Sequence, residues 1–146
     1  MPRVSAVSLR DRKKAGEKIA VLTAYDFPTA KLIDQSGVDV VLVGDSLGMV
    51  VMGRENTLSV TMDEMVYHTR IVSSAVEHAL VVGDMPFLSY QISPQEAVRN
   101  AGRLIAEGGA QAVKLEGPAQ RFGNTIQAIL DASSPVMGHI GLQPQS

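Results

Sequence analysis

Three carboxylates in this chain each follow a short run of apolar residues, and they are the side chains best suited to chemistry. Asp45, Asp84 and Glu116 all stand where such a run gives way to polar residues, glycine or proline. If the runs are parallel strands, their carboxyl ends share one edge of a sheet, where α/β proteins bind ligands. Carboxylates gathered there repel one another unless a cation or shared protons accompany them. The pattern therefore favours a hard divalent ion such as Mg²⁺, held by these three residues.

Helix capping is the alternative role for an acidic residue at a strand end. Asp26 stands close before a predicted short helix, so capping or loop structure is favoured there. Asp45 and Asp84 lie far upstream of the next predicted helices, which have caps of their own, so function is favoured for both. Glu116 precedes Gly-Pro and could favour a helix start electrostatically, and the sequence supports that role and a functional one equally.

Lysine, histidine and serine stand near the same predicted edge. Lys114 lies two residues before Glu116 in an extended segment, so both side chains point to one face. Lys114 could hold a substrate carboxylate, or it could form an ion pair with Glu116 or Asp84. His139 ends a predicted strand, where a substrate contact and a structural role are equally supported. Ser46 has no nearby histidine that would make it a nucleophile.

Composition excludes several classes of function. The chain lacks cysteine, which removes disulfides and thiolate chemistry, and its formal net charge of -2 gives no sign of a nucleic-acid partner. The basic cluster at 10–14 is typical of a solvated helix face. The glycines do not match GxGxxG, which disfavours dinucleotide binding. No apolar stretch has the pattern of a signal peptide or a membrane helix, so we expect a cytoplasmic protein with no membrane partner.

Short apolar runs alternate with amphipathic stretches along the chain. The β-branched content of the runs is typical of buried strands, and the spacing of apolar residues between them is typical of helices. The predicted strands are Ile19–Ala24, Val38–Val43, Leu80–Gly83, Ala110–Leu115 and Val136–Gly138, and the predicted helices are Thr29–Gln35, Thr61–Glu77, 93–107 and Ala119–Ala132. Loops are expected at 44–60, 84–92 and 141–146.

This alternation predicts an α/β protein with a parallel sheet in one domain, 1–146. An open doubly wound sheet and a (β/α)8 barrel both fit. A full barrel takes about 250 residues, so only about its first four and a half βα units would be present. Half a barrel leaves open strand edges. We therefore expect an incomplete chain, a second piece that completes it, or an open sheet.

Six blocks of sequence, in order, resemble ketopantoate hydroxymethyltransferases. They are Thr23–Asp26, Val43–Met49, Tyr67–Thr69, Asp84–Phe87, Val113–Gly117 and Gly138–Gln145. Any one block alone would be a weak signal, whereas six at family-like spacing are highly specific. The resemblance extends from about Lys18 to Ser146.

The resemblance implies a (β/α)8 TIM barrel of the phosphoenolpyruvate/pyruvate type and an activity in pantothenate biosynthesis. The family transfers a hydroxymethyl group from 5,10-methylenetetrahydrofolate to 3-methyl-2-oxobutanoate, giving 2-dehydropantoate. By motif match, Asp45, Asp84 and Glu116 would bind Mg²⁺, and Asp45 and Asp84 would also contact substrate. Ser46 and Lys114 would bind the oxo acid, and His139 would approach the hydroxyl end of the product.

The resemblance also implies that the proton-abstracting glutamate lies beyond Ser146, so we expect no catalytic base in this chain and no activity from it alone. The family is oligomeric, with decamers, so a homo-oligomer is expected. Two alternatives remain open. One is another Mg²⁺-dependent 2-oxo-acid lyase or mutase of the same barrel group, and the other is a non-catalytic assembly fragment.

Overall fold

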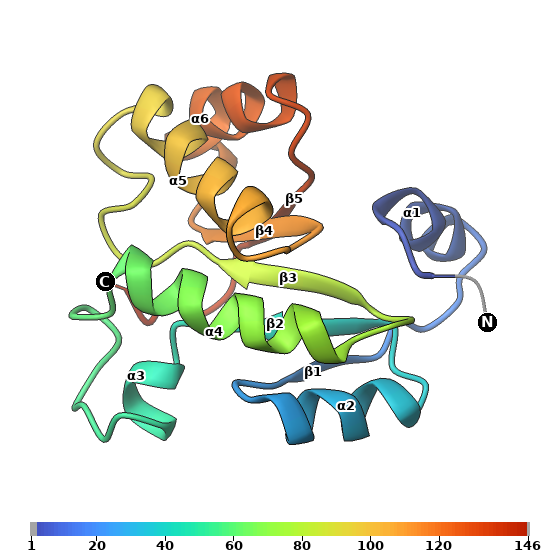
Figure 1. The fold of residues 1–146 in the computed structure, drawn as a ribbon. Coiled ribbons are helices and arrows are strands. Elements are labelled where there is room, and N and C mark those ends of the chain that lie inside the picture. The colour runs from blue at the N-terminus through green and yellow to red at the C-terminus, as the bar shows by residue number, and fades with distance from the viewer. Residues whose placement is uncertain (1–2, 146) are drawn as a thin grey trace.

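The computed structural model describes residues 3–145, and its strands form one parallel sheet (Figure 1). Each strand pairs with the next one along the chain, so the order in the sheet is the order in the sequence. The strands are β1 (Val21–Thr23), β2 (Val40–Val43), β3 (Leu80–Asp84), β4 (Ala112–Glu116) and β5 (Val136–His139). All the carboxyl ends of the strands therefore lie at one edge of the sheet.

The strand order decides between the two architectures that the sequence allowed. An open doubly wound sheet reverses its direction of growth at a switch point, whereas this sheet grows in one direction from β1 to β5. The helices that follow the strands pack against one another in sequence, α2 on α4, α4 on α5 and α5 on α6. Their bounds are α2 (Phe27–Gln35), α4 (Met62–Ala75), α5 (Pro94–Ala106) and α6 (Ala119–Asp131). This is the winding of a barrel.

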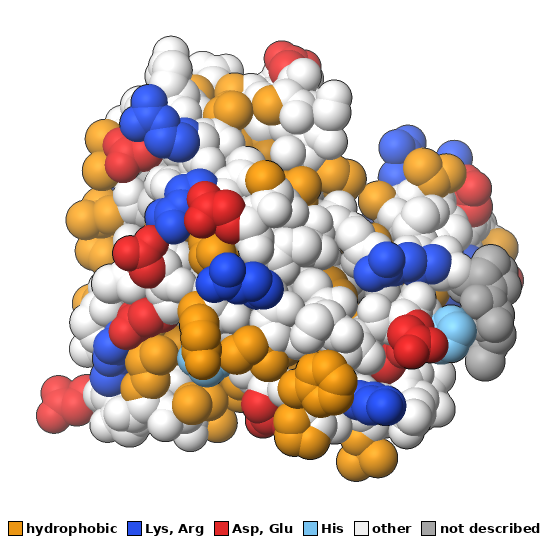
Figure 2. All heavy atoms as spheres, in the orientation of Figure 1, with side chains coloured by type: hydrophobic (Ala, Val, Ile, Leu, Met, Phe, Trp, Pro, Cys, Tyr) orange, Lys and Arg blue, Asp and Glu red, His pale blue; other side chains and the backbone are white. Residues whose placement is uncertain are grey.

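Apolar residues fill both faces of the sheet, as expected of strands buried on two sides. The larger core lies under the helices and includes Val41, Val43, Val81 and Leu115. A smaller cluster around Val40, Leu80 and Ala112 lies on the opposite face, near the start of the strands. Charged pairs cover the outside of α4 and α5, where Figure 2 shows both signs interspersed.

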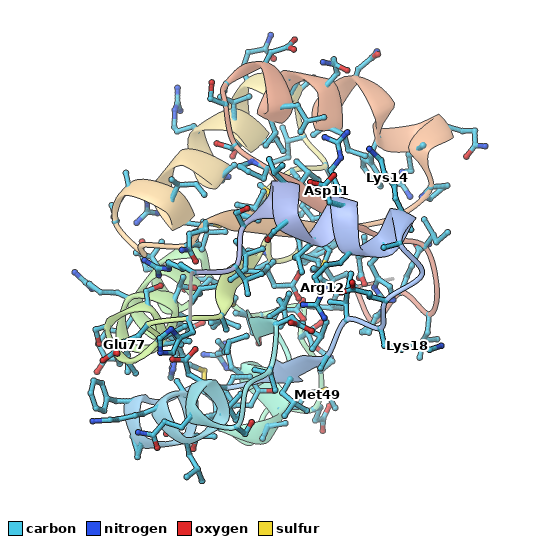
Figure 3. All side chains as sticks on the ribbon, turned by 90° about the vertical axis from the view of Figure 1, so that its right-hand side faces the viewer. Asp11, Arg12, Lys14, Lys18, Met49 and Glu77 are labelled. Atoms are coloured by element: carbon cyan, nitrogen blue, oxygen red, sulfur yellow. The ribbon has the colours of Figure 1, made fainter. Side chains whose placement is uncertain are left out.

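Helix α1 (Ala6–Lys14) lies by the end of the sheet where the strands begin (Figure 1). It has no buried residue, in agreement with the solvated basic face predicted from the sequence. Arg12 is the exception within that face, because its guanidinium pairs with Asp39 and Glu17 and donates to the Lys18 carbonyl at 2.9 Å (Figure 3). Arg12 therefore fastens α1 to the segment at 17–18 and to Asp39.

Asp34 is a buried carboxylate that ties the end of α2 to the start of β3. It accepts the backbone amides of Glu77 at 2.9 Å, His78 at 3.2 Å and Ala79 at 2.8 Å. Burial opposes ionisation of this side chain, but the three amide donors together lower the pKa of Asp34 below its ordinary value. These hydrogen bonds fix the position of the residues just before β3, the strand that ends at Asp84.

Side chains at the helix starts agree with the predicted caps. Asp26 Oδ1 accepts the Thr29 amide at 2.8 Å, which confirms capping for this aspartate and starts α2 before the predicted residue. Thr61 and Glu64 form a reciprocal capping box at the start of α4. In both places a local hydrogen bond, readable from the sequence, sets where the helix begins.

Several bounds differ from the sequence prediction by one to three residues, and the main differences concern a short helix and the ends of three strands. The loop predicted at 44–60 contains a short helix, α3 (Leu47–Val50), because Leu47 is fully buried there. Strand β1 is shorter than predicted. It lies at the edge of the sheet, and the side chains of Val21–Thr23 are exposed. Strands β3 and β4 run on to Asp84 and Glu116, so these two carboxylates belong to strands and not to loops.

Candidate active site

Strand register brings four of the predicted residues together in two facing pairs. Asp84 on β3 is the partner of Lys114 on β4, and Glu116 on β4 is the partner of His139 on β5. Parallel strands with neighbouring ends place such partners side by side across the sheet. The expectation that these residues share one edge is therefore met.

Asp84 and Lys114 form a buried ion pair. Lys114 Nζ lies 2.8 Å from Asp84 Oδ1 and 3.0 Å from Oδ2, so of the two ion-pair partners that the sequence left open the structure shows Asp84. Burial raises the pKa of Asp84 to about 7, with the negative charge of Asp45 adding to the rise and the positive charge of Lys114 opposing it. A carboxyl tuned in this way is typical of functional sites.

Asp45 lies directly beside Asp84. Its backbone amide is 3.3 Å from Asp84 Oδ2, and its own side chain is buried, with only 6% of the residue exposed. Two buried carboxylates next to one lysine leave an excess of negative charge. A hard divalent cation would neutralise that charge, so this position favours cation binding.

Glu116 reaches the same region from β4 but has different neighbours. Its Oε1 accepts the Gln145 backbone amide at 2.8 Å, and its Oε2 lies 3.4 Å from His139 Nδ1. That contact does not meet hydrogen-bond geometry, and within residues 3–145 His139 Nδ1 is a buried atom with no hydrogen-bond partner. His139 Nδ1 therefore faces the Glu116 carboxylate at the site.

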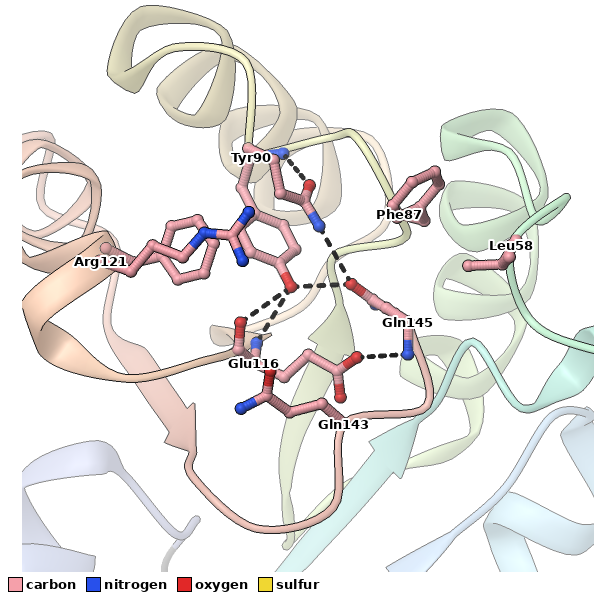
Figure 4. A pocket seen from close by; sticks show the side chains of 9 residues that line it. Leu58, Phe87, Tyr90, Glu116, Arg121, Gln143 and Gln145 are labelled. Carbon is pink, nitrogen blue, oxygen red and sulfur yellow. Dashed lines mark hydrogen bonds between the residues drawn. The ribbon is translucent and has the colours of Figure 1, made fainter.

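Tyr90 and Gln145 complete the site, and the sequence analysis assigned a role to neither. The Tyr90 hydroxyl donates to Gln145 Oε1 at 2.7 Å and accepts the Glu116 backbone amide at 3.3 Å (Figure 4). Burial raises the pKa of the Tyr90 phenol, so it stays a donor. Both residues come from loops, where spacing carries no signal. Two hints were present in the sequence: a large aromatic within the predicted loop 84–92, and Gln145 at the end of the last resemblance block.

A cavity of about 340 Å³ adjoins this network. Its walls combine aromatic rings, carboxamides and charge: Leu58, Phe87, Tyr90, Gln91, Glu116, Arg121, Phe122, Gln143 and Gln145 (Figure 4). Arg121 lies over the Phe122 ring at 5.0 Å from its centroid. Glu116 and Gln145 line the cavity, whereas Asp45, Asp84 and Lys114 do not, so the cavity adjoins the site on its Glu116 side.

Ser46 lies at the start of α3 with its hydroxyl 2.7 Å from the Tyr25 hydroxyl. The segment Gly44–Gly48 does have GxSxG spacing, but a nucleophilic serine needs a base within hydrogen-bond reach. The hydroxyl here pairs with tyrosine instead. His68 contacts the Tyr25 carbonyl through Nδ1 at 2.7 Å, so this histidine holds the loop in place.

The carboxylates meet the requirements of Mg²⁺ in part. Within the described residues, no group of three His, Cys, Asp or Glu side chains is placed to hold a metal ion. Asp45 and Asp84 lie together, whereas Glu116 connects to them through Gln145. Since Mg²⁺ is commonly bound by one or two carboxylates with water and substrate, the buried pair fits such an ion. The three-carboxylate set stays a prediction.

Comparison with known proteins gives a consistent result. The family model described as ketopantoate hydroxymethyltransferase matches residues 3–146. The chain is 60% identical over 146 residues to a protein of Syntrophomonas wolfei and 61% identical over 142 residues to one of Clostridium novyi, both named 3-methyl-2-oxobutanoate hydroxymethyltransferase. The matches cover 100% and 97% of this chain, but only 52% and 51% of the relatives. The chain therefore spans about half the length of these curated relatives.

Solved structures confirm the predicted fold class. Phosphoenolpyruvate phosphomutase from Streptomyces platensis matches with a TM-score of 0.73 at 20% identity, over 92% of this chain and 53% of that one. A 2,3-dimethylmalate lyase of the PEP mutase/isocitrate lyase superfamily matches with a TM-score of 0.70 at 19% identity, over 92% and 52%. These neighbours are barrels of that superfamily, and this chain corresponds to about half of each.

No helix in residues 3–145 has the length and apolar character needed to cross a membrane.

Three of the blocks that carried the resemblance contribute Asp45, Asp84 and Lys114, which meet at this edge. The family match covers that whole edge and nearly the whole chain. We conclude that this chain belongs to the ketopantoate hydroxymethyltransferase family.

Proposed function

We propose that this chain forms the metal- and oxo-acid-binding part of an enzyme that transfers a hydroxymethyl group from 5,10-methylenetetrahydrofolate to 3-methyl-2-oxobutanoate. The product would be 2-dehydropantoate, a precursor of pantothenate. The observation that carries the proposal is the buried group of Asp45, Asp84 and Lys114 at the strand ends of a chain whose relatives are named 3-methyl-2-oxobutanoate hydroxymethyltransferase.

Asp45 and Asp84 would hold Mg²⁺, with Glu116 as a further carboxylate nearby. When bound, the ion would supply Lewis-acid polarisation of the 2-oxo group, which makes the neighbouring carbon more acidic. The excess negative charge of the two buried aspartates supports a cation at this position.

Lys114 and Ser46 would bind the oxo acid. Lys114 has an ammonium group already desolvated by its surroundings, with 14% of its side chain exposed, so a substrate carboxylate would gain a strong charge-assisted hydrogen bond. Ser46 would donate its hydroxyl while Tyr25 holds it in place. His139, whose Nδ1 lies 3.4 Å from Glu116 Oε2, would approach the hydroxyl end of the product.

Calorimetric titration of the purified chain with 3-methyl-2-oxobutanoate, in the presence of Mg²⁺, tests the oxo-acid site. Lys114→Met should weaken binding at least about tenfold, because one charge-assisted hydrogen bond contributes about 1.5–3 kcal/mol. Lys31→Met is a matched control, since Lys31 is exposed on α2. Equal binding by wild type and Lys114→Met would contradict the assignment.

A substrate panel separates this proposal from the related lyases and mutases. Binding of 3-methyl-2-oxobutanoate in preference to phosphonopyruvate is expected, whereas the opposite preference would favour the alternative. Turnover is not expected from residues 1–146 alone, since the resemblance implies a glutamate base outside them. Formation of 2-dehydropantoate by the purified chain would refute that expectation. The folate donor, self-association and a cytoplasmic location also stay predictions.

A further inference from the structure

Gln145 connects groups that lie far apart in the sequence. Its side-chain Nε2 donates to Asp45 Oδ2 at 2.8 Å, although 100 residues separate the two. Its backbone amide donates to Glu116 Oε1 at 2.8 Å. One residue therefore contacts two of the three predicted metal-binding carboxylates, and Gln145 itself is only 6% exposed.

The surroundings of the Gln145 carboxamide fix its orientation. On its nitrogen side lie two acceptors, Asp45 Oδ2 at 2.8 Å and the Met85 carbonyl at 2.9 Å. On its oxygen side lie two donors, the Tyr90 hydroxyl at 2.7 Å and the Gln91 amide at 3.4 Å. A carboxamide has two donor hydrogens and two acceptor lone pairs. A flipped amide would set oxygen against carboxylate, so only one orientation satisfies all four neighbours.

Tyr90 reinforces this arrangement from the other side. It is 1% exposed and its ring packs edge-on to Phe122, with the centroids 5.3 Å apart. Its hydroxyl also accepts the Glu116 backbone amide at 3.3 Å, which leaves its one hydrogen for the Gln145 oxygen. The buried Tyr90 hydroxyl therefore holds the Gln145 side-chain oxygen in place. Because the carboxamide is planar, its nitrogen is held at a fixed position against Asp45.

We propose that Gln145 is a positioning residue of this site, whose side chain holds the Asp45 carboxylate and whose backbone amide holds the Glu116 carboxylate at one fixed separation. The inference rests on the proposed function, in which those carboxylates serve a divalent cation. Partners that orient a ligand in this way commonly change metal affinity about 10–100-fold when they are removed. Gln145 does not itself bind the substrate or the ion in this scheme.

A purely structural role predicts a different outcome. If Gln145 only fastened its own loop to the sheet, its loss would lower the stability of the chain and leave the carboxylates in place. The side chain and the backbone of Gln145 also act on different carboxylates, so a side-chain variant should release Asp45 while Glu116 keeps its amide donor.

The test is Mn²⁺ titration of the purified chain, followed by electron paramagnetic resonance. Gln145→Met keeps the side-chain length and removes its hydrogen bonds, and we expect the Mn²⁺ dissociation constant to rise at least about tenfold. Gln127→Met is the matched control, because Gln127 is exposed on α6 and donates only to Asp131, at 2.7 Å. Gln127→Met should bind Mn²⁺ as wild type does.

Crystal structures of the same variants give a second readout that does not depend on the metal. In Gln145→Met the Asp45 carboxylate should leave its wild-type position while Glu116 stays. If Gln145→Met does not fold, Gln145→Asn serves instead, since it keeps the amide and shortens its reach. An Asp45 carboxylate that stays in place in the folded variant would overturn the inference, as would unchanged Mn²⁺ affinity. Absence of Mn²⁺ binding by wild type would instead contradict the metal in the proposed function, and the Asp45 position would still decide the role of Gln145.

Discussion

Two buried aspartates, Asp34 and Asp84, lie at opposite ends of the same strand and respond to burial in opposite ways. Asp34 sits at the start of β3, where three backbone amides solvate its charge and keep its pKa below the ordinary value. Asp84 sits at the end of β3, beside Lys114 and a second carboxylate, and its pKa is raised to about 7. Backbone amides of the fold stabilise the charge of Asp34, whereas the charge of Asp84 could be stabilised further by a ligand.

This comparison separates stability from function within a single element. At the start of the strand, the amides of Glu77, His78 and Ala79 all donate to Asp34 and together stabilise its charge. At the end of the strand, two carboxylates share one lysine. The same pattern is general in α/β barrels, whose amino-terminal face serves stability and whose carboxyl-terminal face carries the chemistry.

Asp34→Ala should have the largest effect on stability. The substitution removes three amide hydrogen bonds to the Asp34 carboxylate, which contribute about 1 kcal/mol each, so we expect about 3 kcal/mol of lost unfolding free energy. Urea denaturation followed by circular dichroism measures it. A loss below about 1 kcal/mol would mean that water replaces the carboxylate and that Asp34 does not fasten β3.

Asp84→Asn should change how stability depends on pH. An acid whose pKa is raised on folding holds its proton more tightly in the folded state, so its contribution to the unfolding free energy falls as pH rises. For Asp84 that fall runs from about pH 4, the ordinary range, to about 7. The stability of wild type relative to Asp84→Asn should therefore decrease over this window, measured by urea denaturation at several pH values. A difference that stays constant would show that the folded pKa is not raised.

Asp34 should behave in the opposite sense. Because its pKa is lowered on folding, its contribution is present above the ordinary pKa of about 4 and is lost as pH falls below it. Comparing wild type with Asp34→Asn between pH 7 and pH 3 should show the advantage of wild type shrinking on acidification. An advantage that grows on acidification would contradict the assigned direction.

Asp26→Ala should have a smaller effect on stability than the changes at Asp34 and Asp84. Asp26 is exposed and makes one capping bond to the Thr29 amide, and loss of such a cap costs about 1 kcal/mol. The same denaturation assay measures it, with Asp26→Asn as control, because asparagine also caps. A cost as large as that of Asp34→Ala would remove the distinction between a surface cap and a buried anchor.

Local patterns were sufficient to predict most of the fold. Strands rich in valine and helices with Thr61 or Asp26 at their starts follow from short-range hydrogen bonding and apolar spacing. Helix α3 escaped prediction because four residues are too few to show a helical period. The edge strand β1 was shorter than predicted because its side chains gain little from burial.

The site was predictable only where residues stand at strand ends. The sheet register carries Asp84 to Lys114 and Glu116 to His139, so a correct strand assignment was enough to bring these residues to one edge. Tyr90 and Gln145 enter from loops, and their contacts depend on how the whole chain packs. The family resemblance included Gln145 in its last block, but spacing alone assigned it no role.

The central claim is that Asp45 and Asp84 together bind a divalent cation at the carboxyl end of the sheet. Mn²⁺ titration of wild type, Asp45→Asn, Asp84→Asn and the matched surface variant Asp26→Asn tests it most directly. We predict that both buried variants lose at least about tenfold in affinity, since each removes a carboxylate ligand, while Asp26→Asn binds as wild type does. Unchanged affinity in Asp45→Asn and Asp84→Asn would contradict the claim.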